Sequence, residues 1–373
     1  MGYVLGILAA LFVFSTVVSL HELGHMLAAK ACGVGVVEYS IGLGPVLYTK
    51  MFKETVFSVR AIPFGGYCAM VGEKSLEASG KDSKPQKLAR KSLDFKTDWQ
   101  PNQRLTSKKW WQKILIYVAG PAMNIVVGVL ATLLLVLSGN IAVNPTVDAI
   151  KDGYPAASSG IQVGDVLVGV NDRDTLTWSD YMEYMSTHPA ETKNGYDIRV
   201  RRGEKIFTIH ADVSEDDELF GISVKNDKLQ VTPSNIMLYT KNQTVYMFRS
   251  VFDSLRMLIR GDARLSDLTG VVGMTAMIVE EVDDATKTGT SVFAYIMFIL
   301  SFISVNLCIM NMLPLPALDG GRTVLASIEA IIRRPIPERV ELAVNSIGMI
   351  FLLLLLGWTM VHDLIQTVFH MSA

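Results

Sequence analysis

The chain has 373 residues, of which 50% are hydrophobic and 19% are charged, and its formal net charge is -2. Its mean hydropathy of +0.33 is too high for an ordinary soluble protein, and its charge content is too high for a bundle of membrane helices alone. We therefore expect a polytopic α-helical membrane protein with a polar insertion and no nucleic-acid partner. Three cysteines without C-x-x-C spacing argue against a disulfide framework and a cysteine-ligated metal.

Four apolar runs are long enough to cross roughly 30 Å of hydrocarbon as transmembrane helices. They lie at residues 3–29, 114–137, 292–312 and 344–361. With these runs as boundaries, the sequence divides into a first membrane half, an inserted β-rich domain, an amphipathic juxtamembrane region and a second membrane half, at residues 1–140, 141–225, 226–290 and 291–373.

The first apolar run contains the pattern H-E-x-x-H, formed by His21, Glu22 and His25. Positions i and i+4 share one face of a helix, so both imidazoles can reach one metal ion. Two histidines, a third protein ligand and a water complete an open catalytic zinc site, and Glu22 is placed to take a proton from that water. Each ionisable group costs roughly 2.5–3.5 kcal/mol at the centre of a bilayer. A chance occurrence in a membrane-length run is therefore disfavoured.

A cleaved signal peptide is a rival interpretation of this first run, because Ala29-Lys30-Ala31 precedes Cys32 as a small-residue cleavage site would. The run has no basic segment before it, it is too long, and Lys30 does not fit a lipoprotein signal. We therefore expect the first run to stay in the mature protein.

The distribution of Lys and Arg predicts the orientation in the membrane. Residues 30–113 hold 15 basic and 7 acidic residues, whereas residues 138–291 hold 15 basic and 23 acidic residues. This asymmetry puts residues 30–113 and 313–343 in the cytoplasm. Both termini and the segment 138–291 are then extracytoplasmic.

The first cytoplasmic segment contains a β-like stretch. Residues 40–45 form a Gly/Pro turn, and residues 55–70 alternate and then reach Phe64, Gly65 and Gly66. We expect a β-hairpin at 55–70 that is either peripheral or dips into the membrane where it lines a protein cavity. The Lys-rich remainder of residues 74–113 is expected to be a cytoplasmic loop that stays in solvent or touches anionic lipid.

The second run carries Gly120, Pro121 and, one turn later, Asn124. A polar amide in lipid needs a partner within the helix bundle. Asn124 either orients a metal ligand or the substrate backbone, or it joins two helices.

Residues 141–225 indicate a compact extracytoplasmic domain of short strands, with a helix near residues 179–186. The segment Pro155-Ala156-Ala157 and the turn at 159–167 resemble a PDZ domain of the circularly permuted bacterial kind. Such a fold binds a peptide end as an added strand. The expected strands are at residues 146–150, 166–170, 197–201 and 205–213.

The region after this domain returns to the membrane. Residues 245–259 have one apolar face and predict an amphipathic interfacial helix, with a core-facing helix as the alternative. A Gly-hinged turn is expected at residues 268–273.

Asp319 follows the third run and is the natural third metal ligand, with a helix-capping or turn aspartate as the alternative. The first and third runs cross the membrane in the same direction, and His21 lies roughly 27 Å along its helix from Tyr3 at about 1.5 Å per residue. Both halves of the site therefore lie toward the cytoplasmic side. We expect the prolines at 314 and 316 to break the helix and the glycine pair at 320–321 to form a tight turn that presents the carboxylate.

Two further amides, Asn306 and Asn311, lie in the same inner region. They could hold the backbone of a substrate strand or stabilise an oxyanion. Helix–helix hydrogen bonding is the alternative for both.

Together, these motifs resemble the site-2 protease family of intramembrane zinc metalloproteases (peptidase family M50). The narrower resemblance is to the bacterial regulator-of-sigma-E type with one PDZ domain. It implies Zn²⁺ held by His21, His25 and Asp319, with Glu22 as the catalytic base. It also implies a re-entrant hairpin that guides the substrate and an Asn311 that helps to hold it.

The family implies regulated intramembrane proteolysis in the bacterial plasma membrane. The expected substrate is a single-span membrane protein, either an anti-sigma factor or a signal-peptide remnant, already cut outside the membrane. The expected partners are this substrate, the lipid bilayer and a peptide end at the PDZ-like domain. The substrate's identity, the first protease, the oligomeric state and the control of substrate entry stay open.

Two alternatives to a protease are an intramembrane metal transporter and a non-catalytic PDZ membrane adaptor. A transporter would not need Glu22 or a PDZ-like insertion. An adaptor built on an inactive protease would lack ligands, whereas all three candidate ligands are present in this sequence.

Overall fold

The computed structural model divides into two compact units, which are residues 1–131 with 265–373, and residues 132–264. Part of the expected cytoplasmic loop, residues 74–98, lies outside the described residues, as do residues 268–269 of the expected turn. The structure describes residues 2–73, 99–175, 177–188, 195–212, 220–261 and 270–370.

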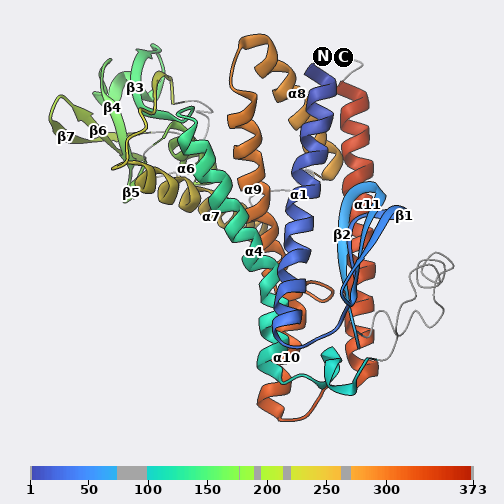
Figure 1. Ribbon diagram of the computed structural model, residues 1–373. Coiled ribbons are helices and arrows are strands. Elements are labelled where there is room, and N and C mark those ends of the chain that lie inside the picture. Colours follow the sequence, from blue (N-terminus) through green and yellow to red (C-terminus); the bar gives the residue numbers. More distant parts are fainter. Residues whose placement is uncertain are drawn as a thin grey trace. The chain divides into compact units, whose positions relative to one another are not determined.

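Four helices in the described part of the chain are long and apolar enough to cross a membrane. They contain the four predicted apolar runs (Figure 1). Three of these helices extend beyond their runs, whereas α9 has the bounds of its run. The four are α1 (Gly2–Ala31), α4 (Trp110–Leu137), α9 (Val292–Met312) and α11 (Glu338–His370).

A further helix of the same unit, α8 (Val271–Thr288), packs against α1 and was not predicted (Figure 1). Its last two turns carry acidic residues, so its hydropathy does not indicate a membrane span. Gly6 of α1 permits the contact, because a Cβ there would lie only 2.7 Å from the Cα of Val279. Small residues allow two helix backbones to approach in this way.

Strands β1 (Val36–Phe52) and β2 (Thr55–Met70) form one long, curled hairpin. The predicted hairpin at 55–70 is therefore a single strand, and its partner is the segment before it. The predicted turn at 40–45 lies inside β1, where positive φ angles of 84° at both Gly42 and Gly44 bend the strand. The error arose because glycines that curve a strand look the same in sequence as glycines that end one.

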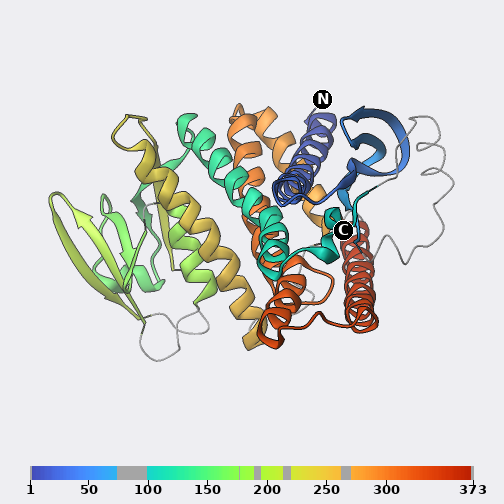
Figure 2. The same ribbon diagram turned by 60° about the horizontal axis from the view of Figure 1, so that its bottom comes forward.

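The bends bring β2 to both sides of β1. Residues 38–41 pair with residues 56–59 along one edge of the strand and with residues 66–69 along the other edge. Figure 2 shows the resulting curled ribbon beside α1. The last residues of β2 thus form an outer strand, with a neighbour in the hairpin on one side only.

Two hydrogen bonds fix the curled hairpin along α1. Ser15 Oγ donates to the carbonyl of Pro63 at 2.6 Å, and Tyr39 Oη donates to the carbonyl of Ser19 at 2.7 Å. Both α1 residues lie in the apolar part of the helix. The part of β2 near Pro63 therefore lies level with the middle of a membrane-length helix.

The second unit is built on a six-stranded sheet with the order β7-β6-β4-β3-β8, in which β5 pairs with β4. The four predicted strands are present, whereas β5 and β8 were not predicted. The sheet and helix α6 (Trp178–Thr187) share one core that includes Leu167, Tyr181 and Ile198, and the short helix α5 (Pro155–Ser159) contacts β7. The strands are β3 (Ala142–Ile150), β4 (Val166–Val170), β5 (Arg173–Asp174), β6 (Tyr196–Arg202), β7 (Lys205–Ala211) and β8 (Ile222–Lys228).

Helix α7 (Ile236–Arg260) belongs to the same unit and contains the predicted amphipathic helix at 245–259. Arg173 connects it to the sheet domain, since Nη2 lies 2.7 Å from Oε2 of Glu183 on α6 and Nη1 lies 3.5 Å from Oδ2 of Asp253 on α7. Burial raises the pKa of Glu183 to about 7; the Arg173 cation opposes this shift, and the nearby Asp253 adds to it.

This raised pKa predicts a pH-dependent local stability. Between about pH 4.3, where a free glutamate titrates, and pH 7, the folded unit holds a proton that the unfolded chain releases. The free energy of opening at α6 should therefore fall as the pH rises through this window. Hydrogen exchange of the full chain should show this fall, and Glu183→Gln should flatten it. A Glu204→Gln control on the exposed β6–β7 turn should leave the slope unchanged, and an unchanged slope in Glu183→Gln would contradict the assignment.

Candidate active site

The H-E-x-x-H residues lie on α1 with the helical spacing that the sequence predicts. His21 and His25 are each only 6% exposed. Two glycines allow α4 to approach them, because a Cβ at Gly24 would lie 2.3 Å from the carbonyl oxygen of Ala119 and a Cβ at Gly120 would lie 2.2 Å from His25 Nε2. Gly120 therefore leaves room for the imidazole of His25.

Asp319 is the first residue of α10 (Asp319–Ile332), so the predicted tight turn is wrong. The glycine pair lies inside the first turn of this helix. A Cβ at Gly320 would lie 2.3 Å from the carbonyl oxygen of Leu313, and one at Gly321 would lie 2.2 Å from that of Leu315. The glycines thus let α10 fold back tightly on the loop that follows α9, and this packing directs Asp319 toward α1.

His21 and His25 come together with Asp319, which lies 294 residues after His25 in the sequence. Asp319 Oδ2 lies 3.1 Å from Nε2 of each histidine, and the two Nε2 atoms are 3.2 Å apart. Donors about 2.0–2.1 Å from a tetrahedral zinc ion lie roughly 3.3–3.4 Å from one another. The nearly equilateral triangle of two nitrogens and one oxygen therefore fits three of the four positions around zinc.

The outer nitrogen of each imidazole has a hydrogen-bond partner on α4. His25 Nδ1 lies 2.8 Å from the carbonyl oxygen of Ile116, so it must donate a proton there, which leaves the Nε2 lone pair free for a metal. His21 Nδ1 lies 3.1 Å from the amide of Asn124, whose Oδ1 is buried without a hydrogen-bond partner. With that amide turned so that Oδ1 accepts from Nδ1–H, the buried oxygen is satisfied and His21 Nε2 is free as well.

This contact predicts a specific effect of substitution at Asn124. Asn124→Ala should weaken zinc binding about 10- to 100-fold, because loss of a partner that orients a metal-ligating histidine typically has that effect. Asn124→Asp, which keeps an acceptor, should retain most of the affinity. Competition with a chelator measures both. The control is Ser301→Ala, which removes a buried 2.9 Å bond from α9 to the carbonyl of Gly128 on α4. Equal zinc affinity in Asn124→Ala and the control would contradict an orienting role.

A cavity of about 420 Å³ opens beside these side chains. Glu22 lines it together with the three candidate ligands, and a Cβ at Gly66 would lie 3.8 Å from Glu22 Cγ. Residues 67–70 of the outer strand line the cavity as well. The cavity is therefore lined by the Glu22 carboxylate, by the candidate metal ligands and by a strand with an open edge.

The other predicted substrate residues are distributed around this cavity. Asn311, near the end of α9, lines it, whereas Asn306 is half-buried in α9 and is not part of the lining. Phe64 and Gly65 belong to the bend in β2 that precedes the outer strand. A role in substrate binding stays a prediction for these four residues and for Gly66.

Sequence reasoning missed several residues that line the cavity. Glu73 follows the end of β2, Arg322 lies one turn after Asp319, and Tyr117 faces both from α4. Spacing offered a signal for Arg322 only, since residues i and i+3 share a helix face. Glu73 and Tyr117 carry no local pattern of this kind.

Comparison with known proteins identifies the family to which the chain belongs. The model of peptidase family M50 matches residues 9–355. The regulator of sigma-W protease RasP of Bacillus subtilis is 27% identical, with 94% of this chain and 96% of that protein covered. The zinc metalloprotease RasP of Bacillus licheniformis is 26% identical over the same shares, and the metalloprotease MmpA of Caulobacter vibrioides is 28% identical over 94% and 93%.

The match covers nearly the whole chain, so the resemblance noted from the sequence motifs is confirmed at the level of the family. Four membrane-length helices agree with it, and zinc is the metal that the relatives' names give. The chain therefore belongs to peptidase family M50 and is a membrane-embedded zinc metalloprotease.

Proposed function

We propose that this protease cuts a peptide bond of a single-span membrane protein inside the bilayer, near the cytoplasmic end of α1. His21, His25 and Asp319 would hold zinc, and Glu22 would act as general base. The observation that carries the proposal is the triangle of donor atoms 3.1–3.2 Å apart on and beside a membrane-length helix. The neighbouring Glu22 gives this metal centre a proton acceptor, which a site that only transports a metal does not need.

Zinc, when bound, polarises the substrate carbonyl and lowers the pKa of a coordinated water to near 7. Glu22 takes a proton from the attacking water as the new carbon–oxygen bond forms. It then gives this proton to the amide nitrogen that leaves as the carbon–nitrogen bond breaks. Asn311 on the cavity wall would hold the substrate backbone.

The outer strand of the curled hairpin provides a way to present the substrate. The peptide groups of a transmembrane helix are hydrogen-bonded to one another and out of reach of a protease, so the helix must unwind locally. Residues 66–70 pair with β1, and residues 67–70 also line the cavity. A substrate segment would add to this edge as a strand, with its scissile carbonyl facing Glu22.

Disulfide cross-linking tests strand addition directly. In a chain whose native cysteines are replaced, a cysteine introduced at Tyr67 should cross-link to alternate positions of a substrate scanned with cysteine. Side chains of a strand alternate between its two faces, so the yield should have a period of two residues. A period of three to four residues would instead mean that the substrate stays helical at this edge.

The second unit would recognise the substrate's extracytoplasmic end. Strand β8 lies at one edge of the sheet and pairs with β3 on its inner side, which suits a PDZ-like domain that binds a peptide as an additional strand. A fluorescent peptide with a free carboxyl terminus should bind the full chain more tightly than its amidated form. Equal affinities would argue against recognition of a carboxyl terminus.

The topology that suits this role puts both termini and the second unit outside a bacterial plasma membrane and the active site toward the cytoplasm. The excess of basic residues in 30–113 and of acidic residues in 138–291 supports this orientation. Labelling of single cysteines in intact cells tests it. A cysteine in segment 138–291 should react with an impermeant reagent.

Cleavage of a single-span substrate by the purified protein in detergent tests the central proposal. We expect cleavage inside the substrate's membrane segment, its loss with a zinc chelator, and its return when zinc is added. Anti-sigma factors and signal-peptide remnants are the substrate classes to compare. Zinc flux into proteoliposomes without cleavage would favour the transporter, and peptide binding without either activity would favour the adaptor.

A further inference from the structure

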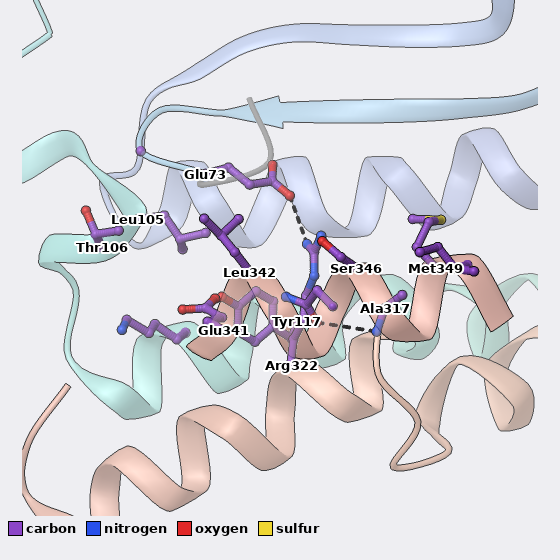
Figure 3. A pocket seen from close by; sticks show the side chains of 14 residues that line it. Glu73, Leu105, Thr106, Tyr117, Ala317, Arg322, Glu341, Leu342, Ser346 and Met349 are labelled. Carbon is purple, nitrogen blue, oxygen red and sulfur yellow. Dashed lines mark hydrogen bonds and ion pairs between the residues drawn. The ribbon is translucent and has the colours of Figure 1, made fainter. Parts of the chain in front are cut away.

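One ion pair lies in the wall between the active-site cavity and a second cavity. Arg322 Nη1 donates to Glu73 Oε1 at 2.9 Å, and Figure 3 shows the two side chains directed toward one another. Both residues line the cavity that contains Glu22 and the candidate ligands. Both also line the second cavity, of about 400 Å³, whose lining includes further residues of α4 and α11 and residues 105–106.

The Arg322 end of this pair belongs to the helix that carries Asp319. Arg322 lies three residues after Asp319 in the first turn of α10, so the two side chains share a helix face. Its guanidinium group also lies 6.0 Å from the centre of the Tyr117 ring on α4, within the range of a cation–π contact. A displacement of this helical turn would therefore move Asp319 and the backbone of Arg322 together.

The Glu73 end lies three residues after the outer strand of the hairpin. The backbone N–H of Glu73 donates to the carbonyl of Met70 at 3.2 Å, which closes a turn directly after β2. Val71, inside this turn, donates to the carbonyl of Gly35 at 2.8 Å and accepts from the N–H of Leu105 at 2.8 Å. The backbone before Glu73 is thus fixed on both sides, and the carboxylate has a defined position relative to the strand edge at 66–70.

We propose that Glu73 and Arg322 are a positioning pair that sets the distance between the substrate-pairing strand and the metal-ligating carboxylate of Asp319. The inference rests on the proposed function, because it takes the strand edge as the substrate site and Asp319 as a zinc ligand. A hydrogen bond between two ionised groups is about twice as strong as a neutral one, and it is directional. The pair therefore suits a connection whose geometry matters, since a shift of about 1 Å at a reacting centre can reduce the rate about 100-fold.

A second ion pair on the same helix serves as a control for a merely structural role. Lys113 Nζ of α4 lies 2.7 Å from Glu329 Oε2 of α10, and both side chains are slightly more buried than that of Glu73. Neither residue lines the active-site cavity. Loss of this pair should loosen α10 without changing the distance between the strand edge and Asp319.

The test compares Glu73→Gln and Arg322→Gln with Glu329→Gln in the full-length protein in detergent. We expect the first two variants to bind zinc 10- to 100-fold more weakly in competition with a chelator. Their kcat should fall at least about tenfold while KM changes less than about twofold, since the loss lies in alignment and not in ground-state binding. Glu329→Gln should lower the melting temperature and leave zinc affinity, kcat and KM within about twofold of the parent protein.

Arg322→Lys gives a second, milder variant in case Arg322→Gln does not fold. Lysine keeps the charge but lacks the planar, forked geometry of the guanidinium group, so we expect partial recovery of both zinc affinity and kcat. The proposal is wrong if Glu73→Gln melts like Glu329→Gln and has unchanged zinc affinity and kcat. Failure of the proposed function would look different, because the parent protein itself would then bind no zinc or cut no substrate.

Discussion

Glu22→Gln should abolish proteolysis while the protein still binds zinc. Glutamine has nearly the same shape as glutamate but cannot accept a proton, and Glu22 itself is not one of the three converging donors. Loss of a general base typically reduces a rate about 10²–10⁴-fold. We therefore expect kcat for a single-span substrate to fall by at least about 100-fold, with KM little changed.

Two measurements on the same preparation separate this outcome from misfolding. The zinc content, measured by elemental analysis, should stay at the level of the parent protein, and the melting temperature should not fall. Glu38→Gln on the hairpin provides a control, because it removes a carboxylate that pairs with Arg60 at 2.8 Å outside the lining of the active-site cavity. Full proteolytic activity in Glu22→Gln would exclude Glu22 as the base.

Replacement of any one converging donor should remove both zinc and activity. Two remaining ligands cannot fill three positions around zinc, so His21→Ala, His25→Ala and Asp319→Ala should each weaken binding by more than the 10- to 100-fold expected for an outer partner. Elemental analysis after dialysis should find little zinc in these proteins, and cleavage should be undetectable. The effect on zinc distinguishes this group of variants from Glu22→Gln.

A histidine outside the site controls for a general effect of such substitutions. His362 on α11 stacks on Trp358 with ring centres 5.5 Å apart and does not belong to the donor cluster. His362→Ala should leave the zinc content and the cleavage rate unchanged. An Asp319→Ala protein that keeps one tightly bound zinc per chain would show that a different group completes the metal centre.

The sequence by itself predicted the features of this protein that depend on local spacing and hydropathy. The four membrane-length helices follow from runs of apolar residues, and the shared face of His21 and His25 follows from the helical repeat. Asp319 could be paired with them because the charge of the loops predicts that both halves of the site lie toward one side of the membrane. Each of these inferences needs only the residues within a segment and the direction in which the segment crosses the bilayer.

Features that depend on contacts between distant segments could not be predicted in this way. The second pairing side of residues 38–41 exists only because β1 and β2 bend at glycines, and α8 is stabilised by its contact with α1. The glycine pair at 320–321 looked like a turn, yet it is helical because the preceding loop leaves no space for a Cβ.

The chain alone therefore determined which residues could hold zinc, because helical repeat and burial cost act within a single segment. Only the tertiary structure decided how closely Asp319 approaches two histidines that lie at least 294 residues before it, and that Asn124, Tyr117 and the Glu73–Arg322 pair surround these donors. Such distances are set by side-chain packing between elements, which depends on the shapes of all the partners together and leaves no repeating signal in the sequence.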